Sequence, residues 1–534
     1  MSFDNKYIPL ITGIAIAMGV LIGSKLNFST NEAVFAKNSK KEKLNRLIDY
    51  IDYEYVDAVN TDSIVDVTVN GILENLDPHS VYIPESEYQA AADDMRGNFT
   101  GIGISFYVYK DSIAVIRAIE GGPAARAGIK PGDRILYADG KQVFGENLDR
   151  DSISEYLKGV KNSSVALTIK RSGEKKLRDV DVKRKTVPLV SVDASYTLTK
   201  DLGYIKINRF AETTPDEFKK ALSELKKEGV SRLVLDLRSN PGGYISAAEE
   251  IIDEFLEDDK LILVTKNKNG EEEESFATSR GDFEDGKIYV LINENSASAS
   301  EIVAGALQDN DKGTIVGRRS FGKGLVQREM SLGDGSAVRL TIARYYTPTG
   351  RSIQKPYSEG KEAYYDDYET RYNNGELQSA DSISVNDSLR YVTPKGKVVY
   401  GGGGIIPDIF VPKDTSMEGE TINYVSRNGT MSYFAFEYLD THRIEFKDIS
   451  QAQFIADYII DDTVVEEFLE YVRLNDSPVM FRDYKDALKK AIKANLAQQL
   501  YGNNAFEFIL NENDAMIEKI LELERRPVKT PVKE

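Results

Sequence analysis

Short apolar runs separated by helical patterns dominate the middle of the chain. Residues 202–207, 233–237 and 288–292 are mostly apolar and are bounded by turn residues, so each run predicts a buried β-strand. Residues 215–228 and 302–307 instead repeat apolar positions at helical spacing. Because strands that alternate with helices pair in parallel, this region is expected to form an α/β core with its functional groups at the strand ends.

A glycine-punctuated module precedes this core, at residues 96–185. Its pattern predicts short strands joined by glycine-rich turns, and a helix at about 151–158. The module resembles a PDZ domain, and the resemblance implies a carboxylate-binding loop made of Gly101, Ile102, Gly103 and Ile104. Successive glycine-framed N–H groups suit a C-terminal carboxylate, and a substrate tail can add as a strand. The alternative is a generic β-rich domain whose glycines only make turns.

An apolar segment lies within residues 1–36. Residues 7–24 contain no charged side chain, and Lys6 and Lys25 flank them. That length is at the lower limit for a membrane-spanning helix and within the range of a signal-peptide core. We expect an uncleaved single-pass anchor. The alternative is a cleaved signal, but its small-residue site at Val34–Ala36 lies far beyond the apolar core.

Helical patterns flank the module and the core. Residues 37–95 predict an N-terminal helical segment, which a proline turn breaks at Leu76–Ser80. The core is expected to span residues 186–412, with a polar surface insertion at 357–395. Residues 413–534 predict a separate acidic helical region, whose apolar faces are expected to form a local core, with a partner surface as the alternative.

Charge and residue usage narrow the chemistry. The net charge of −18 and the pI near 4.9 argue against nucleic-acid binding, because phosphate contacts need a basic surface. The chain has no cysteine, which excludes a thiol nucleophile, and its two histidines, His79 and His442, lie in no metal-ligand pattern. A Ser-His-Asp triad would need long-range folding around one of them. His79 follows a proline in a helix-ending turn, which favours a capping or packing role. We expect no metal and no cofactor.

Three serines spaced by alanines, Ser296, Ser298 and Ser300, follow the strand at 288–292. A small-residue turn between strand and helix can hold a hydroxyl exposed beside backbone N–H groups. Ser298 and Glu301 also form a capping-box pattern, which is a commoner feature than a nucleophile.

A lysine is the base that this composition supplies most easily. Burial lowers the pKa of a lysine, so that its amine is neutral when it must accept a proton. Lys323 suits this role because the glycines on both sides let the backbone come close. Gln327 is able to orient the amine without adding a charge.

The segment Ser-Ala-Ser-Ala-Ser-Glu at 296–301 and the segment Phe-Gly-Lys-Gly-Leu-Val-Gln at 321–327 closely resemble the carboxyl-terminal processing proteases. These are serine peptidases with a Ser-Lys dyad, and the resemblance covers roughly residues 40–412. It implies that Ser298 is the nucleophile, with Ser296 and Ser300 as framework residues. It also implies that Lys323 is the general base and that Gln327 is its partner.

The Asp-Leu-Arg-x-Asn-x-Gly-Gly element at 236–243 matches the same family. In that family this turn contributes an N–H group to the oxyanion hole. The resemblance places the role on Gly242 or Gly243, paired with the N–H of Ala299. Two such donors supply several kcal/mol of transition-state stabilisation. Taken alone, Pro-Gly-Gly is an ordinary turn.

The sequence and the resemblance together predict an α/β protease core, a mixed sheet with helices, that carries an inserted PDZ domain. The resemblance implies a serine endopeptidase that processes or degrades extracytoplasmic proteins from their C-terminal or unfolded tails. It is expected in the bacterial inner membrane with its catalytic region in the periplasm, or secreted to the periplasm after signal cleavage. A homodimer or an adaptor protein is a further expected partner. The rivals are a catalytically silent PDZ scaffold and a lipase-like esterase that uses the same dyad.

Overall fold

The computed structural model describes Met18 and residues 39–109, 111–145, 150–475 and 485–525. The chain divides into two compact units, Met1–Ile72 and Leu73–Glu534. The first unit contains α2 (Ser39–Glu54) and most of α3 (Thr61–Glu74), as the helical pattern predicts. Asn60 caps α3, since its side chain accepts the N–H of Ser63 at 3.1 Å. Among the described residues, no helix is both long and apolar enough to cross a membrane. The anchor predicted at residues 1–36 lies outside them, apart from Met18.

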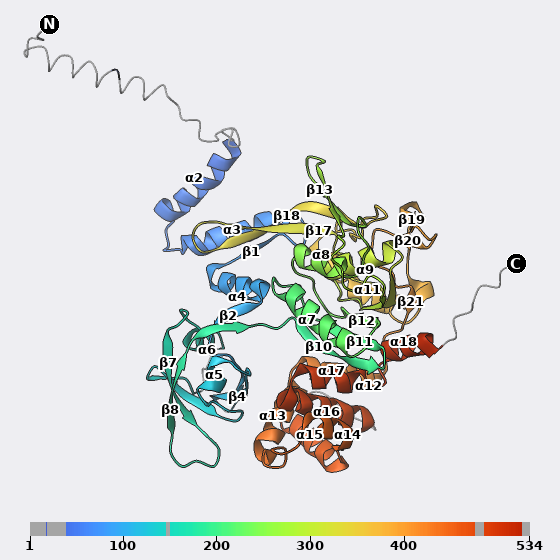
Figure 1. The fold of residues 1–534 in the computed structure, drawn as a ribbon. Helices are drawn as coiled ribbons and strands as arrows, with labels where there is room; N and C mark the ends of the chain where they lie inside the picture. Colours follow the sequence, from blue (N-terminus) through green and yellow to red (C-terminus); the bar gives the residue numbers. More distant parts are fainter. Residues whose placement is uncertain (1–17, 19–38, 110, 146–149, 476–484, 526–534) are drawn as a thin grey trace, which may run out of the picture. The chain divides into compact units, whose positions relative to one another are not determined.

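A six-stranded sheet forms the centre of the second unit (Figure 1). Its first strand is antiparallel and the others are parallel, which confirms the α/β core. The predicted runs at 202–207, 233–237 and 288–292 are three of its strands. In spatial order the strands are β10 (Val192–Thr199), β11 (Leu202–Ile207), β12 (Arg232–Asp236), β15 (Lys287–Ile292), β16 (Gly313–Gly317) and β21 (Ile409–Phe410).

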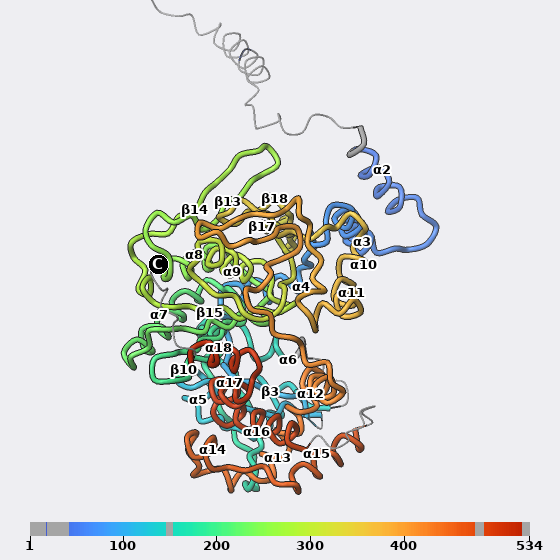
Figure 2. Tube along the Cα trace, turned by 90° about the vertical axis from the view of Figure 1, so that its right-hand side faces the viewer, coloured from blue at the N-terminus to red at the C-terminus, as the bar shows by residue number. Residues whose placement is uncertain are grey.

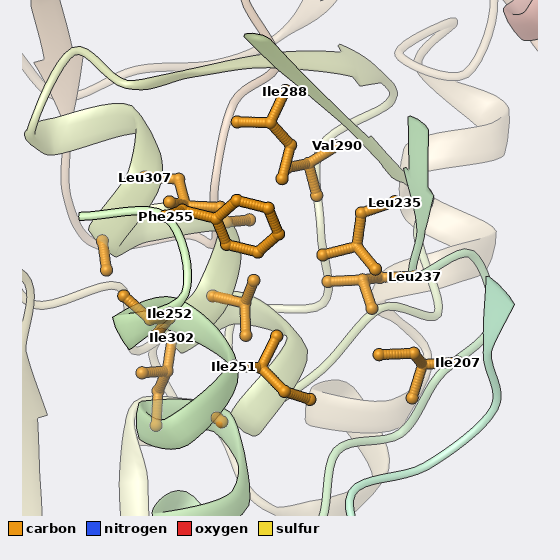
Figure 3. Close-up of a cluster of buried hydrophobic side chains, with 14 of the residues drawn as sticks. Ile207, Leu235, Leu237, Ile251, Ile252, Phe255, Ile288, Val290, Ile302 and Leu307 are labelled. Atoms are coloured by element: carbon orange, nitrogen blue, oxygen red, sulfur yellow. The ribbon is translucent and has the colours of Figure 1, made fainter. Parts of the chain in front are cut away.

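Helices cover both faces of this sheet because side chains alternate between the faces along each strand. One face, which includes Leu235 and Ile288, packs on α7 (Thr214–Lys227), α8 (Ile245–Asp253) and α9 (Ala299–Asp309) (Figure 3). The other face packs on α18 (Ala515–Arg525).

The C-terminal region is helical, as predicted, and its core is mostly its own. Helices α13 to α16 lie together in one cluster (Figure 2). The prediction of a separate region needs a correction for α17 and α18, which pack on the core, because the second face of the sheet is apolar and must be covered. The helices are α12 (Met417–Arg427), α13 (Thr430–His442), α14 (Gln451–Asp457), α15 (Asp462–Leu474), α16 (Lys485–Tyr501), α17 (Asn503–Asn511) and α18.

A second, five-stranded sheet lies beside α8. Its long strand β18 (Ala337–Tyr346) pairs with β17 along one side, and with β1 and β13 along the other. The edge strand β14 contains most of the acidic run at 271–274, whose side chains stay exposed while the backbone pairs with β13. The remaining strands are β1 (Val81–Ile83), β13 (Leu261–Asn267), β14 (Glu272–Phe276) and β17 (Leu325–Ser331), and α4 (Glu85–Arg96) follows β1.

The predicted PDZ module is an insertion. Its first strand, β2 (Asn98–Gly101), pairs with its last, β9 (Lys185–Pro188), so the chain enters and leaves it at one place. Between them the strands run in the spatial order β3-β4-β5-β7-β8, with β6 paired to β5. Their bounds are β3 (Ile104–Tyr109), β4 (Ser112–Ala118), β5 (Arg134–Ala138), β6 (Lys141–Gln142), β7 (Ser164–Lys170) and β8 (Arg178–Lys183), with helices α5 (Pro123–Arg126) and α6 (Arg150–Leu157).

The segment at 357–395, predicted as a surface insertion, is partly buried. Tyr364, Arg371 and Leu377 are each at most 2% exposed. The interpretation fails here because a polar composition also fits a segment whose few buried side chains contact the core. The segment contains α10 (Lys361–Tyr365), α11 (Asp367–Asn373), η3 (Ala380–Ser382), η4 (Asp387–Leu389) and β19 (Arg390–Val392), which pairs with β20 (Val398–Tyr400).

Candidate active site

The three serines occupy the turn between β15 and α9, and only the middle one is partly exposed. Ser296 is fully buried and its hydroxyl donates to the carbonyl of Leu237 at 2.8 Å. Ser300 is also fully buried and donates to the carbonyl of Asn240 at 3.0 Å. These two hydroxyls hold the turn against the loop that follows β12. Among the three, Ser298 is the one that a substrate can reach.

Ser298 has an unusual backbone conformation, with φ of 55° and ψ of −115°. Residues with a Cβ adopt positive φ rarely and at a cost of about 1–3 kcal/mol, and such residues cluster at active sites. Ser298 is followed by Ala299, the first residue of α9, so its hydroxyl lies at a helix N-terminus. The N–H groups there favour developing negative charge.

Lys323 lies in a turn that only glycines can flank. A Cβ on Gly322 would lie 3.1 Å from the nitrogen of Gly404, and φ there is +90°. A Cβ on Gly324 would lie 2.9 Å from the nitrogen of Gln354. The sequence argument that glycines permit a close backbone approach is therefore confirmed.

Two buried side chains, Glu301 and Tyr345, each contact the backbones of both Ser298 and Lys323. Within the residues that the structure describes, no hydrogen bond joins the hydroxyl of Ser298 to the amine of Lys323. The carboxylate of Glu301 accepts the backbone N–H of Ser298 at 2.9 Å and that of Lys323 at 2.8 Å, both at Oε2. The hydroxyl of Tyr345 lies 2.8 Å from the carbonyl oxygen of Lys323 and 3.3 Å from that of Ser298. The capping box of Ser298 and Glu301 is present, so the structural and functional readings of this motif are both compatible with the geometry.

Burial, and to a smaller extent the positive charge of Arg339, lowers the pKa of Lys323 from 10.5 to about 8. The carboxylates of Glu301 and Asp77 act in the opposite direction. A lysine with this pKa is neutral often enough near neutral pH to accept a proton.

Gln327 occupies β17, four residues after the lysine. Its amide donates to the hydroxyl of Thr341 at 3.3 Å, and Thr341 donates to Asp77 at 3.1 Å. In the described part of the chain, no hydrogen bond joins Gln327 to the amine of Lys323. The predicted orienting role of Gln327 stays a prediction.

The turn at 240–243 lies directly against the nucleophile. A Cβ on Gly242 would lie 2.7 Å from the Cβ of Ser298 and 2.9 Å from the nitrogen of Ala299. The N–H of Gly242, however, donates to the side chain of Asn240 at 2.8 Å. The N–H of Gly242 is therefore less available to an oxyanion, and the role of Gly243 and Ala299 as oxyanion donors stays a prediction.

The loop at 76–80 reaches the same site, which the sequence did not indicate. Asp77 accepts hydrogen bonds from the N–H groups of His79 and Ser80, at 2.8 Å and 3.0 Å. His79 bonds Tyr364 through Nε2 at 2.8 Å and packs edge-on against Phe321. Burial and the charge of Lys323 lower the pKa of His79 to about 4, so it is neutral.

The contacts of the two histidines do not support a Ser-His-Asp triad or a metal site. The contacts of His79 fit the packing role expected from the sequence. His442 stacks on Tyr438 in the C-terminal helices. In the parts of the chain that the structure describes, no group of three metal-ligating side chains occurs.

The predicted tail-binding residues join β2 to β3, since Gly101 ends β2 and Ile104 begins β3. Gly103 has φ of +75° and its carbonyl accepts the N–H of Ile119 at 3.0 Å. Ile102 is 1% exposed and belongs to the PDZ core, whereas Ile104 is only partly buried. Since β3 is an edge strand of its sheet, a peptide can pair with its outer side.

A cavity of about 540 Å³ lies between α8 and the second sheet, and neither Ser298 nor Lys323 is among the residues that line it. Val326, three residues after Lys323, and Ile245, two residues after Gly243, are among its apolar walls. Its opposite wall is formed by the acidic residues 271–274 and by Glu249. The cavity is large enough to contain a side chain of an extended peptide.

Comparisons with known proteins agree with this arrangement. Peptidase family S41 matches residues 201–360, the PDZ domain family matches residues 100–183, and a family of unknown function matches residues 421–502. The chain is 35% identical over 333 residues to the carboxy-terminal processing protease CtpB of Bacillus subtilis, covering 61% of this chain and 68% of that protein. It is 34% identical to a carboxy-terminal-processing protease of Bartonella bacilliformis, covering 66% of this chain and 80% of that protein. A solved structure of a photosystem II D1 C-terminal processing protease aligns with 70% of this chain and 86% of its own, at 26% identity and a TM-score of 0.36.

Proposed function

Because this chain belongs to peptidase family S41, as a carboxy-terminal processing serine protease with a PDZ domain, we propose that Ser298 and Lys323 are its catalytic dyad. The observation that supports the proposal is that Glu301 accepts the backbone N–H groups of both a partly exposed serine and a partly buried lysine.

The chemistry follows from these groups. Neutral Lys323 takes the proton from Oγ of Ser298 as that oxygen attacks the scissile carbonyl carbon. The N–H groups of Ala299 and Gly243 stabilise the oxyanion. The amide C–N bond then breaks, Lys323 returns the proton to the leaving amine, and an acyl-enzyme remains. A water molecule loses a proton to Lys323 and attacks the acyl carbon. The bond from that carbon to Oγ breaks, Lys323 returns the proton to Oγ of Ser298, and the new C-terminal acid leaves.

The substrates of this peptidase are the C-terminal tails of extracytoplasmic proteins. The tail pairs with the outer side of β3, and its carboxylate lies at the N–H groups of residues 101–104. Burial of Ile102 fits a PDZ core directly beneath that loop. The anchor predicted at residues 1–36 supports action outside the cytoplasm, and the terminal helices offer faces for a homodimer or an adaptor protein.

The test uses the purified full chain, with Lys323→Ala and Ser298→Ala variants. Each is incubated with an unfolded protein that ends in an apolar residue and with its C-terminally amidated twin, and fragments are identified by mass spectrometry. Cleavage by the native chain alone, weakened by amidation, supports both the dyad and tail capture.

Other outcomes separate the rivals. Equal cleavage of both substrates keeps the peptidase but removes the tail-capture proposal. Cleavage that survives in Lys323→Ala contradicts the dyad. Binding of the tail peptide without cleavage favours a scaffold, and hydrolysis of a simple ester without peptide cleavage favours the esterase.

A further inference from the structure

Glu301 is fully buried, and its carboxylate is saturated by the two loops that contain the dyad. Oε2 accepts the N–H groups of Ser298 and Lys323, as described above. Oε1 accepts the hydroxyl of Ser320 at 2.5 Å and the N–H of Gly322 at 2.7 Å. A carboxylate offers about four acceptor positions. The N–H groups of Ser298 and Lys323, with two donors just before Lys323, occupy all four.

The hydroxyl of Tyr345 contacts the backbone carbonyl groups of the same two residues, Ser298 and Lys323. Tyr345 itself is 1% exposed. The N–H groups of the dyad residues thus meet one acceptor, and their carbonyls meet one donor. The structure assigns Glu301 and Tyr345 as positioning residues that hold Ser298 and Lys323 in catalytic register, an inference that rests on the proposed dyad.

The backbone conformation of Ser298 explains why Glu301 and Tyr345 must hold this residue in place. A serine at φ of 55° persists only when its surroundings over-determine that conformation. Here the N–H of Ser298 is held by Glu301 and its carbonyl by Tyr345. Since the same two groups also hold Lys323, a shift of either loop changes the alignment of hydroxyl and amine.

Glu301 differs from Tyr345 in also carrying a charge. Lys323 is faced by Arg339 of β18, by Asp77 and His79 of the loop at 76–80, and by Glu301 of α9. An anionic Glu301 favours the ammonium form of Lys323, so removal of that charge favours the neutral amine. The two positioning residues therefore predict different pH signatures.

The experiment compares full-chain Tyr345→Phe and Glu301→Gln with the native protein on a peptide substrate, across pH. Both variants are expected to lose about 10- to 100-fold in kcat with KM changed by no more than about twofold, because small misplacements of reacting groups have effects of that size. Tyr345→Phe keeps the native pH at which activity rises, whereas Glu301→Gln moves that rise to lower pH.

Tyr289→Phe is the matched control. Tyr289 is 1% exposed and donates to Glu524 at the opposite end of β15 from the serine turn. It therefore loses a buried hydrogen bond of similar kind without touching the dyad, and its kcat is expected to equal the native value. A native kcat in Tyr345→Phe, or a loss equal to that of Tyr289→Phe, overturns the proposal.

Two further measurements distinguish a positioning role of Glu301 and Tyr345 from a general contribution to stability. Amide hydrogen exchange of Tyr345→Phe should increase in peptides that cover residues 293–301 and 318–327 and nowhere else. Loss of protection throughout the chain in both variants would assign the two side chains to general stability and overturn the proposal. If Ser298→Ala and Lys323→Ala still cleave, the proposed function fails. If they are inactive while Tyr345→Phe and Glu301→Gln have native activity, only the positioning role of Glu301 and Tyr345 is wrong.

Discussion

Gly242 lies so close to Ser298 that a Cβ on residue 242 would be 2.7 Å from the Cβ of the serine. The backbone of Gly242 also has φ of +103°, which residues with a Cβ rarely adopt. This contact fixes the loop after β12 against the turn after β15. It therefore sets the distance between Ser298 and the proposed oxyanion donors.

Gly242→Ala is expected to lower kcat by about 100-fold or more, because the added methyl displaces either the oxyanion turn or Ser298. Unfolding free energy should also fall, by about 1–3 kcal/mol. Gly229→Ala is the control, since Gly229 has φ of +95° with open space around its Cβ position. It should lose stability with native kcat. Equal kcat in the two variants would contradict the close contact.

The activity is expected to rise with pH through the pKa of Lys323, about 8. In the proposed mechanism the neutral lysine is the base, so activity is present above this pKa and is lost as pH falls below it. Arg339→Gln removes a charge that lowers this pKa, so the rise should move to higher pH. The measurement is kcat/KM against pH.

Arg344→Gln serves as the control for this shift, because Arg344 lies on the same strand and contacts Tyr357. Its pH profile should equal the native one. A native profile in Arg339→Gln would mean that this arginine does not influence the base.

His79 is expected to be dispensable for the chemistry. His79→Gln should keep kcat within about 10-fold of the native value, because a neutral, packed imidazole is not the base in a dyad of serine and lysine. Lys323→Ala should lose far more. A loss as large in His79→Gln as in Lys323→Ala would reopen a histidine mechanism.

His79 also predicts how stability depends on acid. Its pKa falls from 6.5 in a model compound to about 4 in the folded chain. The unfolded chain therefore binds the proton first, so stability is lost as pH decreases from about 6.5 to 4. The melting temperature of the native protein should fall across this window, and His79→Gln should reduce that fall. Parallel melting curves would contradict the burial of a neutral imidazole.

Asp309 and Arg351 form an ion pair in which both side chains are fully buried, with 2.7 Å between Oδ1 and Nη2. Thr349 donates to the same carboxylate at 2.6 Å. Asp309→Asn should lower the free energy of unfolding by about 3–5 kcal/mol, because it leaves a buried guanidinium without its counter-charge. Denaturant unfolding measures this loss. Lys266→Gln, at an exposed ion pair with Glu272, should show no comparable loss.

The sequence determined the local elements and the family, and it supplied the candidate dyad. Continuous apolar runs predicted the core strands, and apolar positions at helical spacing predicted the helices, because burial acts on each element separately. The spacing of Ser298 and Lys323 within two short motifs identified the family. The glycines at 322 and 324 were also informative, since only a residue without a Cβ permits that backbone approach.

Tertiary structure alone decided which distant groups support the dyad. Glu301 was readable only as a helix cap, and Tyr345 only as a strand residue, until the fold placed both on the peptide units of Ser298 and Lys323. The same holds for Asp77, for the buried Tyr364, and for the hydrogen bond of Gly242 to Asn240. These contacts join segments far apart in the chain, and each has a net value of only about 1 kcal/mol. Local periodicity contains no information on them, because they depend on the packing of the whole core.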